Sequence, residues 1–176
     1  FRYEESDPNI LQSLSFSVKE GEQVTLTGRT GAGKSTIFKL LLGLYTPQKG
    51  NVLINGQPAD ALSENQRRKI ISCVEQNFSM VPGTILDQIT LFDPDITLEQ
   101  AQTAAGLTGL DEVIRSFPED YNTPCKPGLF SQGQWQLLSI ARAVATNPRI
   151  LLLDEITANL DADTEQTVLS ALNRAG

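Results

Sequence analysis

Residues 28–35 read Gly-Arg-Thr-Gly-Ala-Gly-Lys-Ser, and they stand between the apolar segment Gln23 to Thr27 and a helical pattern from Lys34 to Leu44. A G-x-x-x-x-G-K-S spacing between a strand and a helix is the context that a phosphate-binding loop requires. Glycines let successive backbone N–H groups point inward at a polyphosphate, and the positive end of the helix dipole adds to their field. We therefore expect Lys34 to bridge the β- and γ-phosphates and the Ser35 hydroxyl to bind Mg²⁺.

Strand and helix patterns alternate along the chain, which favours an α/β architecture around a largely parallel sheet. Strands are predicted at Gln23 to Thr27, at Asn51 to Asn55 between the turn residues Gly50 and Gly56, at Ile70 to Glu75 and at Ile150 to Leu153. The last is a continuous apolar run, as in a strand buried on both faces.

Strand patterns stop between Val81 and Glu119. Short helices are predicted there around Thr84 to Ile89, Leu98 to Ala105 and Leu110 to Ser116. A longer amphipathic helix follows, with its apolar stripe between Leu137 and Ala145. Ser131 and Gln134 form an S-x-x-Q capping box at its start, and Pro148 closes it. We interpret residues 78–146, approximately, as a helical subdomain inserted into the α/β frame.

Composition excludes several classes of protein. Fourteen Lys and Arg against 21 Asp and Glu give a net charge of −7, which disfavours a general nucleic-acid binder. Two cysteines and no histidine cannot form the usual four-ligand Cys/His zinc site, so any metal must bind to oxygen ligands. No apolar run is long enough to span a bilayer, and no signal-peptide pattern is present. Because the first residue is Phe1, we expect an excised cytoplasmic piece of a longer protein.

Two acidic residues, Asp154 and Glu155, directly follow the apolar run Ile150 to Leu153. Loops at the carboxyl ends of parallel strands form the ligand crevice of such folds. Asp154 is placed to hold Mg²⁺ there, and Glu155 to orient and deprotonate an attacking water. Two acids after a strand are by themselves more typical of a helix start or a solvated turn; the phosphate-loop motif upstream favours the functional interpretation.

These residues resemble the nucleotide-binding domain of the ATP-binding cassette (ABC) family, and further motifs follow in the family's order. Phe130 to Gln134, Phe-Ser-Gln-Gly-Gln, is similar to the family signature L-S-G-G-Q, although Gln132 replaces its first glycine. Gln76 resembles the hinge glutamine that reaches Mg²⁺ and the attacking water, and Tyr3 the aromatic residue that stacks on adenine. Ala158 to Asp161 resembles the loop that crosses the dimer interface, and Gly83 to Ile89 resembles the G-T-I-x-x-N-I of exporters.

The resemblance implies a P-loop NTPase (RecA-like) core over residues 1–176, with a small N-terminal β subdomain and the inserted helical subdomain. It implies ATP and Mg²⁺ as ligands, a second nucleotide-binding domain as a head-to-tail partner, and a transmembrane domain fused upstream, so that this domain lies on the cytoplasmic face of a membrane. The nucleotide-binding residues that it implies are Tyr3, Gly28, Arg29, Thr30, Gly31, Ala32, Gly33, Lys34, Ser35 and Thr36, and the Mg²⁺ ligands are Ser35, Gln76 and Asp154. The implied catalytic residues are Glu155, Gln76 and Lys34. The signature acting in trans comprises Ser131, Gln132, Gly133 and Gln134, and the dimer interface contains Asn159 and Asp161.

Two features depart from the family pattern. The histidine expected beyond the catalytic glutamate is absent, so we expect a chain truncated before it that hydrolyses ATP poorly in isolation. Residues 123–128 match the exporter stretch T-x-V-G-E-x-G only at Thr123 and Gly128. Three alternatives remain: a cassette ATPase of translation or chromosome maintenance, a P-loop kinase, and a nucleotide-binding regulator with a weak site. A P-loop kinase would need a substrate-binding lid rich in arginines, whereas the arginines of this chain are scattered.

Overall fold

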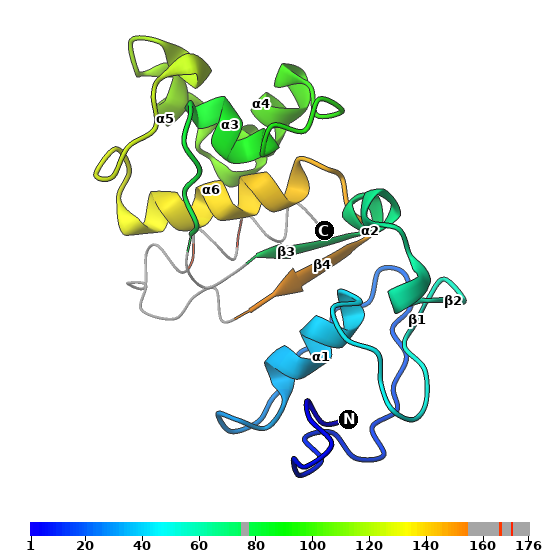
Figure 1. The fold of residues 1–176 in the computed structure, drawn as a ribbon. Helices are drawn as coiled ribbons and strands as arrows, with labels where there is room; N and C mark the ends of the chain where they lie inside the picture. Colours follow the sequence, from blue (N-terminus) through cyan, green and yellow to red (C-terminus); the bar gives the residue numbers. More distant parts are fainter. Residues whose placement is uncertain (75–77, 155–165, 167–169, 171–176) are drawn as a thin grey trace. The chain divides into compact units, whose positions relative to one another are not determined.

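The computed structural model describes residues 1–74, 78–154, 166 and 170. Two compact units make up the chain, an N-terminal unit, Phe1–Arg67, and a C-terminal unit, Arg68–Gly176. Figure 1 shows the course of the chain through both. None of the helices in the described ranges is both long enough and apolar enough to cross a membrane.

The N-terminal unit contains one helix and one hairpin. Its elements are α1 (Lys34–Leu41), β1 (Leu53–Ile54), β2 (Gln57–Pro58) and the 3-10 turn η1 (Ala59–Ala61). β1 and β2 pair antiparallel across Asn55 and Gly56, whose φ angles are 50° and 79°. An Asn-Gly pair with both φ angles positive is the sequence that a tight two-residue hairpin needs. The turn expected at Gly56 is therefore confirmed, while the strand predicted over Asn51 to Asn55 is reduced to two residues.

The strand predicted over Gln23 to Thr27 is wrong for this structure. These residues have no regular secondary structure, and Val24 is 53% exposed. Apolar and β-branched residues favour an extended backbone, but a strand is stable only when a neighbour accepts its hydrogen bonds. Among the described residues of the N-terminal unit, only β1 and β2 form such a ladder.

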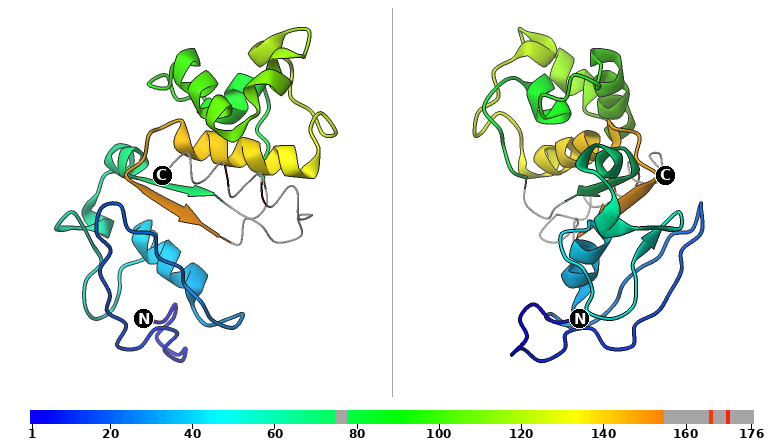
Figure 2. Two further views of the ribbon diagram at one scale, coloured as in Figure 1. Left: turned by 180° about the vertical axis from the view of Figure 1, so that it is seen from behind. Right: turned by 45° about the vertical axis from the view of Figure 1, so that its right-hand side comes forward.

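The C-terminal unit is built around a long helix. After α2 (Glu64–Ile70), which crosses the boundary between the units, come β3 (Ile71–Val74), α3 (Ile85–Thr90), α4 (Leu98–Thr108), α5 (Asp111–Arg115), the 3-10 turn η2 (Asp120–Asn122), α6 (Gln132–Val144) and β4 (Ile150–Leu153). α6 packs against β3, α3 and α4, and it lies between the two strands and the helices α3 to α5 (Figure 1). Figure 2 shows the same layering from two other directions. The predicted helices and both strands of this unit are therefore confirmed, with boundaries shifted by a few residues.

Helix starts in this unit are fixed by side chains. α3, α4 and α6 each begin with a capping box, formed by Thr84 with Asp87, Thr97 with Gln100 and Ser131 with Gln134. Each box satisfies two backbone N–H groups that the helix itself leaves without a partner. The apolar stripe of α6 is buried as predicted, with Leu138, Ile140 and Ala141 at 0% exposure.

β3 and β4 pair in parallel, with Ile71 opposite Ile150 and Val74 opposite Leu153. The apolar run of β4 predicts burial on both faces, and this prediction is wrong in part. Leu152 is buried, but Leu153 is 36% exposed. Within the described residues β4 pairs with β3 alone.

Candidate functional site

The turn before α1 has the backbone of an anion-binding loop. Gly31 and Gly33 have φ angles of 81° and 92°, in the left-handed region that side chains disfavour. A Cβ atom at Gly33 would lie 2.7 Å from Cδ2 of Leu11, so only glycine fits there without movement. Gly33 is the N-cap of α1 and no side chain caps this end; a helix start of this kind is a general anion-binding position.

Lys34 places its ammonium group across this loop. Its Nζ donates to the carbonyl oxygens of Gly28 at 2.9 Å and of Arg29 at 3.4 Å. Ala32 N–H donates to the same Arg29 carbonyl at 3.1 Å, which closes the turn. The positive charge therefore lies over the loop's own backbone, where a phosphate oxygen would be a stronger acceptor than a carbonyl. The remaining loop residues that the sequence singles out, Thr30 and Ser35, are exposed.

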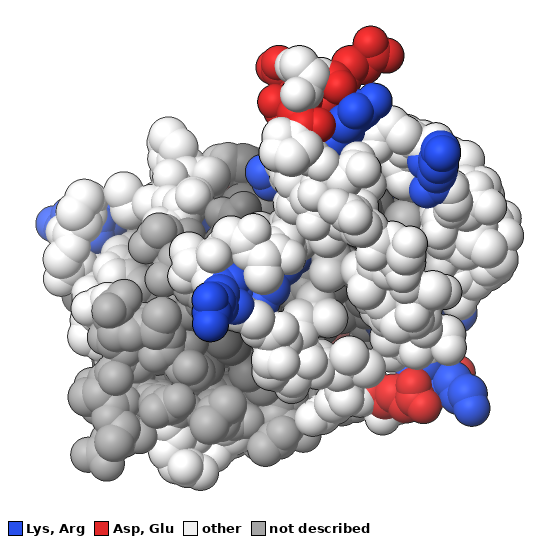
Figure 3. Space-filling model, turned by 90° about the horizontal axis from the view of Figure 1, so that it is seen from below, with Lys and Arg blue, Asp and Glu red and all other residues white. Residues whose placement is uncertain are grey.

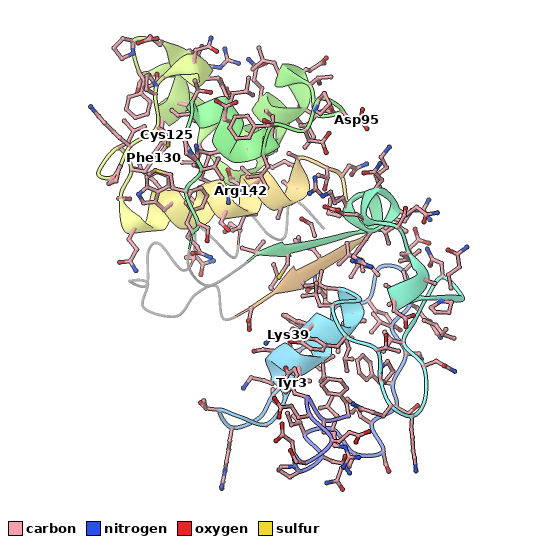
Figure 4. The ribbon with its side chains drawn as sticks, viewed as in Figure 1. Tyr3, Lys39, Asp95, Cys125, Phe130 and Arg142 are labelled. Carbon is pink, nitrogen blue, oxygen red and sulfur yellow. The ribbon has the colours of Figure 1, made fainter. Side chains whose placement is uncertain are left out.

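Tyr3 lies against the first turn of α1. Its hydroxyl is 3.1 Å from Oγ1 of Thr36, a buried residue. The ring makes edge contacts with Phe1 and Tyr45, at centroid distances of 5.2 Å and 5.0 Å. Lys39 Nζ is 5.3 Å from the Tyr3 centroid, and Figure 4 shows the two side chains together. With Tyr3 36% exposed, part of the ring faces solvent beside the phosphate-loop helix.

In the C-terminal unit, the parallel strands bring Asp154 to the edge where β3 ends. Asp154 directly follows β4, and its N–H donates to the carbonyl of Val74 at 3.1 Å. Four of the predicted site residues, Gln76, Glu155, Asn159 and Asp161, lie outside the described residues.

The predicted signature segment forms the start of α6. Ser131 N–H donates to Oε1 of Gln134 at 2.9 Å, and Gln134 N–H donates to Oγ of Ser131 at 3.2 Å. Gln132 and Gly133 are the first two residues of the helix, and Gln132 is exposed. Phe130, 5% exposed, anchors the segment by edge contacts with Phe117 and Trp135. The capping box is confirmed, and Ser131 and Gln132 are exposed.

The resolved pKa shifts lie away from these predicted residues. Burial and the hydrogen bond to Asp111 raise the pKa of Tyr121. Burial also acts to raise the pKa of Asp111, but hydrogen bonds from Tyr121 and Arg115 outweigh it and lower that pKa. Burial raises the pKa of the Cys125 thiol, so it stays protonated at neutral pH. Tyr121 and Asp111 tie η2 to α5. We assign neither these groups nor Cys125 a part in the candidate site.

Sequence reasoning did not single out three residues, Lys39, Arg142 and Gln88, whose contacts the structure shows. Lys39 lies over Tyr3, one helical turn beyond Thr36. Arg142 donates from Nε to the Gln88 carbonyl at 2.6 Å and from Nη1 to the Ser79 carbonyl at 3.0 Å. The Gln88 amide donates to the Val81 carbonyl at 2.8 Å. A polar residue in the middle of an apolar helix stripe is the signal that marks Gln88, which is fully buried. On the face of the molecule in Figure 3, the described Lys and Arg side chains are scattered among uncharged ones.

Comparisons with known proteins agree with this arrangement. The ABC transporter family model matches residues 11–158. The chain is 40% identical to the toxin RTX-III translocation ATP-binding protein of Actinobacillus pleuropneumoniae, over 99% of this chain and 25% of that protein. It is 38% identical to the alpha-hemolysin translocation ATP-binding protein HlyB of Escherichia coli O157:H7, again over 99% of this chain and 25% of that protein.

A solved structure, that of a bacterial Atm1-family ABC exporter with ATP bound, is 36% identical with a TM-score of 0.85. It covers 100% of this chain, which in turn covers 31% of the exporter chain. The chain thus spans about a quarter of the length of the curated relatives it matches. The family model covers most of the chain, and the curated relatives and the solved structure are ABC transport proteins as well. The chain therefore belongs to the ABC transporter family and has the fold of that family's nucleotide-binding domain.

Proposed function

We propose that the chain binds and hydrolyses MgATP and that this reaction powers export of a substrate across a membrane. The observation that carries the proposal is the loop before α1, where two left-handed glycines, an uncapped helix start and the Lys34 ammonium meet. Relatives named for toxin translocation and an exporter solved with ATP support transport over roles in translation or chromosome maintenance.

Residues 28–36 bind the phosphates through backbone N–H groups and Lys34, and the exposed part of Tyr3 receives the adenine ring. Ser35, Gln76 and Asp154 hold Mg²⁺. Their hydroxyl, amide and carboxylate oxygens are the hard ligands that this ion prefers. Bound Mg²⁺ supplies charge neutralisation at the phosphates.

Glu155 acts as the general base for the attacking water, and Gln76 orients that water. The open start of α6, Ser131 to Gln134, contacts the nucleotide of a second nucleotide-binding domain, and Asn159 and Asp161 line the interface. A transmembrane partner determines the substrate, and the domain lies on the cytoplasmic face of that membrane. The division into an N-terminal β subdomain and a helical subdomain over about 78–146 belongs to the same proposal.

The test compares Lys34→Ala and Glu155→Gln with the unchanged chain, using Lys69→Ala as the control because Lys69 is exposed and pairs only weakly with Asp95 at 3.5 Å. Hydrogen bonds to charged partners contribute about 1.5–3 kcal/mol, so Lys34→Ala should weaken MgATP binding at least about tenfold. With a second nucleotide-binding domain present to complete the site, Glu155→Gln should keep the affinity and lower hydrolysis by about 10²- to 10⁴-fold, the usual effect of losing a positioned base.

Equal affinity of Lys34→Ala and Lys69→Ala for a fluorescent ATP analogue would refute the phosphate-loop assignment. Unchanged hydrolysis in Glu155→Gln would refute the catalytic assignment and support a nucleotide-binding regulator instead.

A further inference from the structure

Tyr3, to which the proposed function gives the adenine ring, lies in a part of the N-terminal unit without regular secondary structure. Residues 1–33 form no helix or strand, so the position of the Tyr3 ring depends on individual contacts. The hydrogen bonds that fix it come from residues 33 to 46 positions later in the chain, within the same compact unit, Phe1–Arg67. These contacts show which side chains determine where the ring lies.

Gln48 holds the backbone directly before Tyr3. Its Nε2 donates to the Arg2 carbonyl at 2.6 Å, and its Oε1 accepts from Arg2 N–H at 3.2 Å. An amide side chain that uses its donor and its acceptor on one residue reproduces the two-bond pairing between opposite residues of an antiparallel sheet. The backbone therefore enters Tyr3 in a fixed direction, although no strand is present there.

The helix α1 holds the Tyr3 side chain at two points. The Tyr3 hydroxyl is 3.1 Å from Oγ1 of Thr36, which is buried, and the Lys39 ammonium lies 5.3 Å from the ring centroid, within the range of a cation–π contact (Figure 4). Thr36 and Lys39 are three positions apart, so they lie on the same face of α1. Because α1 begins at the phosphate loop, one helix sets the position of the ring relative to the loop.

Two aromatic neighbours complete the surroundings of the Tyr3 ring. Phe1 and Tyr45 meet it edge-on, with 83° and 75° between the ring planes. The ring nevertheless stays 36% exposed, so it is fixed in orientation while part of its surface faces solvent. A binding surface that is already held in place spares a ligand the cost of ordering it.

We propose that Lys39 and Gln48 are positioning residues for the base of the nucleotide. They hold the Tyr3 ring beside the phosphate loop, so that a ligand with a base binds more tightly than one with phosphates alone. This inference rests on the proposed function, because it takes Tyr3 as the residue that receives adenine. Neither Lys39 nor Gln48 is assigned a contact with nucleotide, and each acts through Tyr3.

The test compares the dissociation constants of MgATP and of inorganic triphosphate with Mg²⁺, both measured by equilibrium dialysis. Lys39→Met removes the charge and keeps an unbranched side chain, whereas Lys39→Arg keeps a cation for the ring. Gln48→Met removes the amide at similar volume. The matched control is Lys49→Met, the same charge change at an exposed lysine of the same unit. Thermal unfolding shows that each variant folds.

We expect Lys39→Met to weaken MgATP binding by about two- to fivefold, which corresponds to an exposed cation–π contact, and to leave triphosphate binding as it is in Lys49→Met. Lys39→Arg should restore the affinity for MgATP, and Gln48→Met should lower it without affecting triphosphate. In a Tyr3→Ala background, neither Lys39→Met nor Gln48→Met should cause a further loss, because the ring that they hold is gone. A purely structural role would weaken both ligands alike.

The inference is overturned if Lys39→Met weakens MgATP and triphosphate equally, if Lys39→Arg loses as much as Lys39→Met, or if either loss persists in the Tyr3→Ala background. Full MgATP affinity in both Lys39→Met and Gln48→Met overturns it as well. If the unchanged chain binds neither ligand, or if Tyr3→Ala alone leaves MgATP affinity unchanged, the proposed function fails first. The unchanged chain and Tyr3→Ala therefore distinguish that failure from a failure of this inference.

Discussion

Replacing Gln88 by methionine tests how strongly the buried amide stabilises the C-terminal unit. The side chain is 0% exposed and makes three hydrogen bonds to the backbone of Val81 and Thr84. Methionine has a similar volume and retains the apolar packing, so the loss is chiefly that of the hydrogen bonds. At about 1 kcal/mol for each bond, the free energy of unfolding should fall by about 3 kcal/mol.

Urea unfolding followed by Trp135 emission measures this loss, because the single tryptophan lies in the same unit as Gln88. With a slope of roughly 2 kcal/mol per molar, the midpoint should fall by about 1.5 M. The matched control is Gln100→Met, which removes an exposed capping-box side chain from α4 and should cost under about 1 kcal/mol. If the two variants unfold at the same midpoint, burial of the Gln88 amide adds nothing and the reasoning about residues 78–84 is wrong.

Three further predictions concern other parts of the chain. Gly33→Ala should destabilise the N-terminal unit by at least about 2 kcal/mol, since a left-handed φ of 92° and a Cβ 2.7 Å from Leu11 act together; circular dichroism during heating checks this. Tyr121→Phe removes the hydrogen bond that keeps the pKa of Asp111 low, so the variant should lose about 1–2 kcal/mol of stability. A lowered folded-state pKa stabilises above the unfolded pKa, so this deficit should persist at neutral pH and shrink below about pH 4, as acid titration with urea unfolding would reveal. Tyr3→Ala should weaken ATP binding by about fivefold and leave inorganic triphosphate binding unchanged in competition dialysis, unless Tyr3 does not contact adenine.

Local sequence patterns determined the elements whose stability is local. The capping box of Ser131 and Gln134 predicted the start of α6 to the residue, and the periodic apolar stripe predicted which of its faces is buried. The spacing of Gly31, Gly33 and Lys34 predicted a glycine turn leading directly into a helix, because left-handed backbone at those positions requires glycine. Family membership followed from the same motifs, read in their order along the chain.

Tertiary structure decided what depends on residues far apart in the sequence. The apolar segment Gln23 to Thr27 forms no strand, and Leu153 is partly exposed, because pairing and burial depend on neighbours that no local pattern specifies. Arg142 reaches the carbonyl of Gln88, 54 residues earlier in the chain, and that of Ser79, 63 residues earlier. From the sequence, an arginine in a helix pattern is predicted to be a solvated side chain. Only the packing of α6 beside α3 brings the Arg142 guanidinium to the Phe78 ring. Sequence thus specified the phosphate loop and the helix starts through short-range hydrogen bonds and backbone preference. The contacts of Arg142 with Ser79 and Phe78 exist only because folding brings distant side chains together.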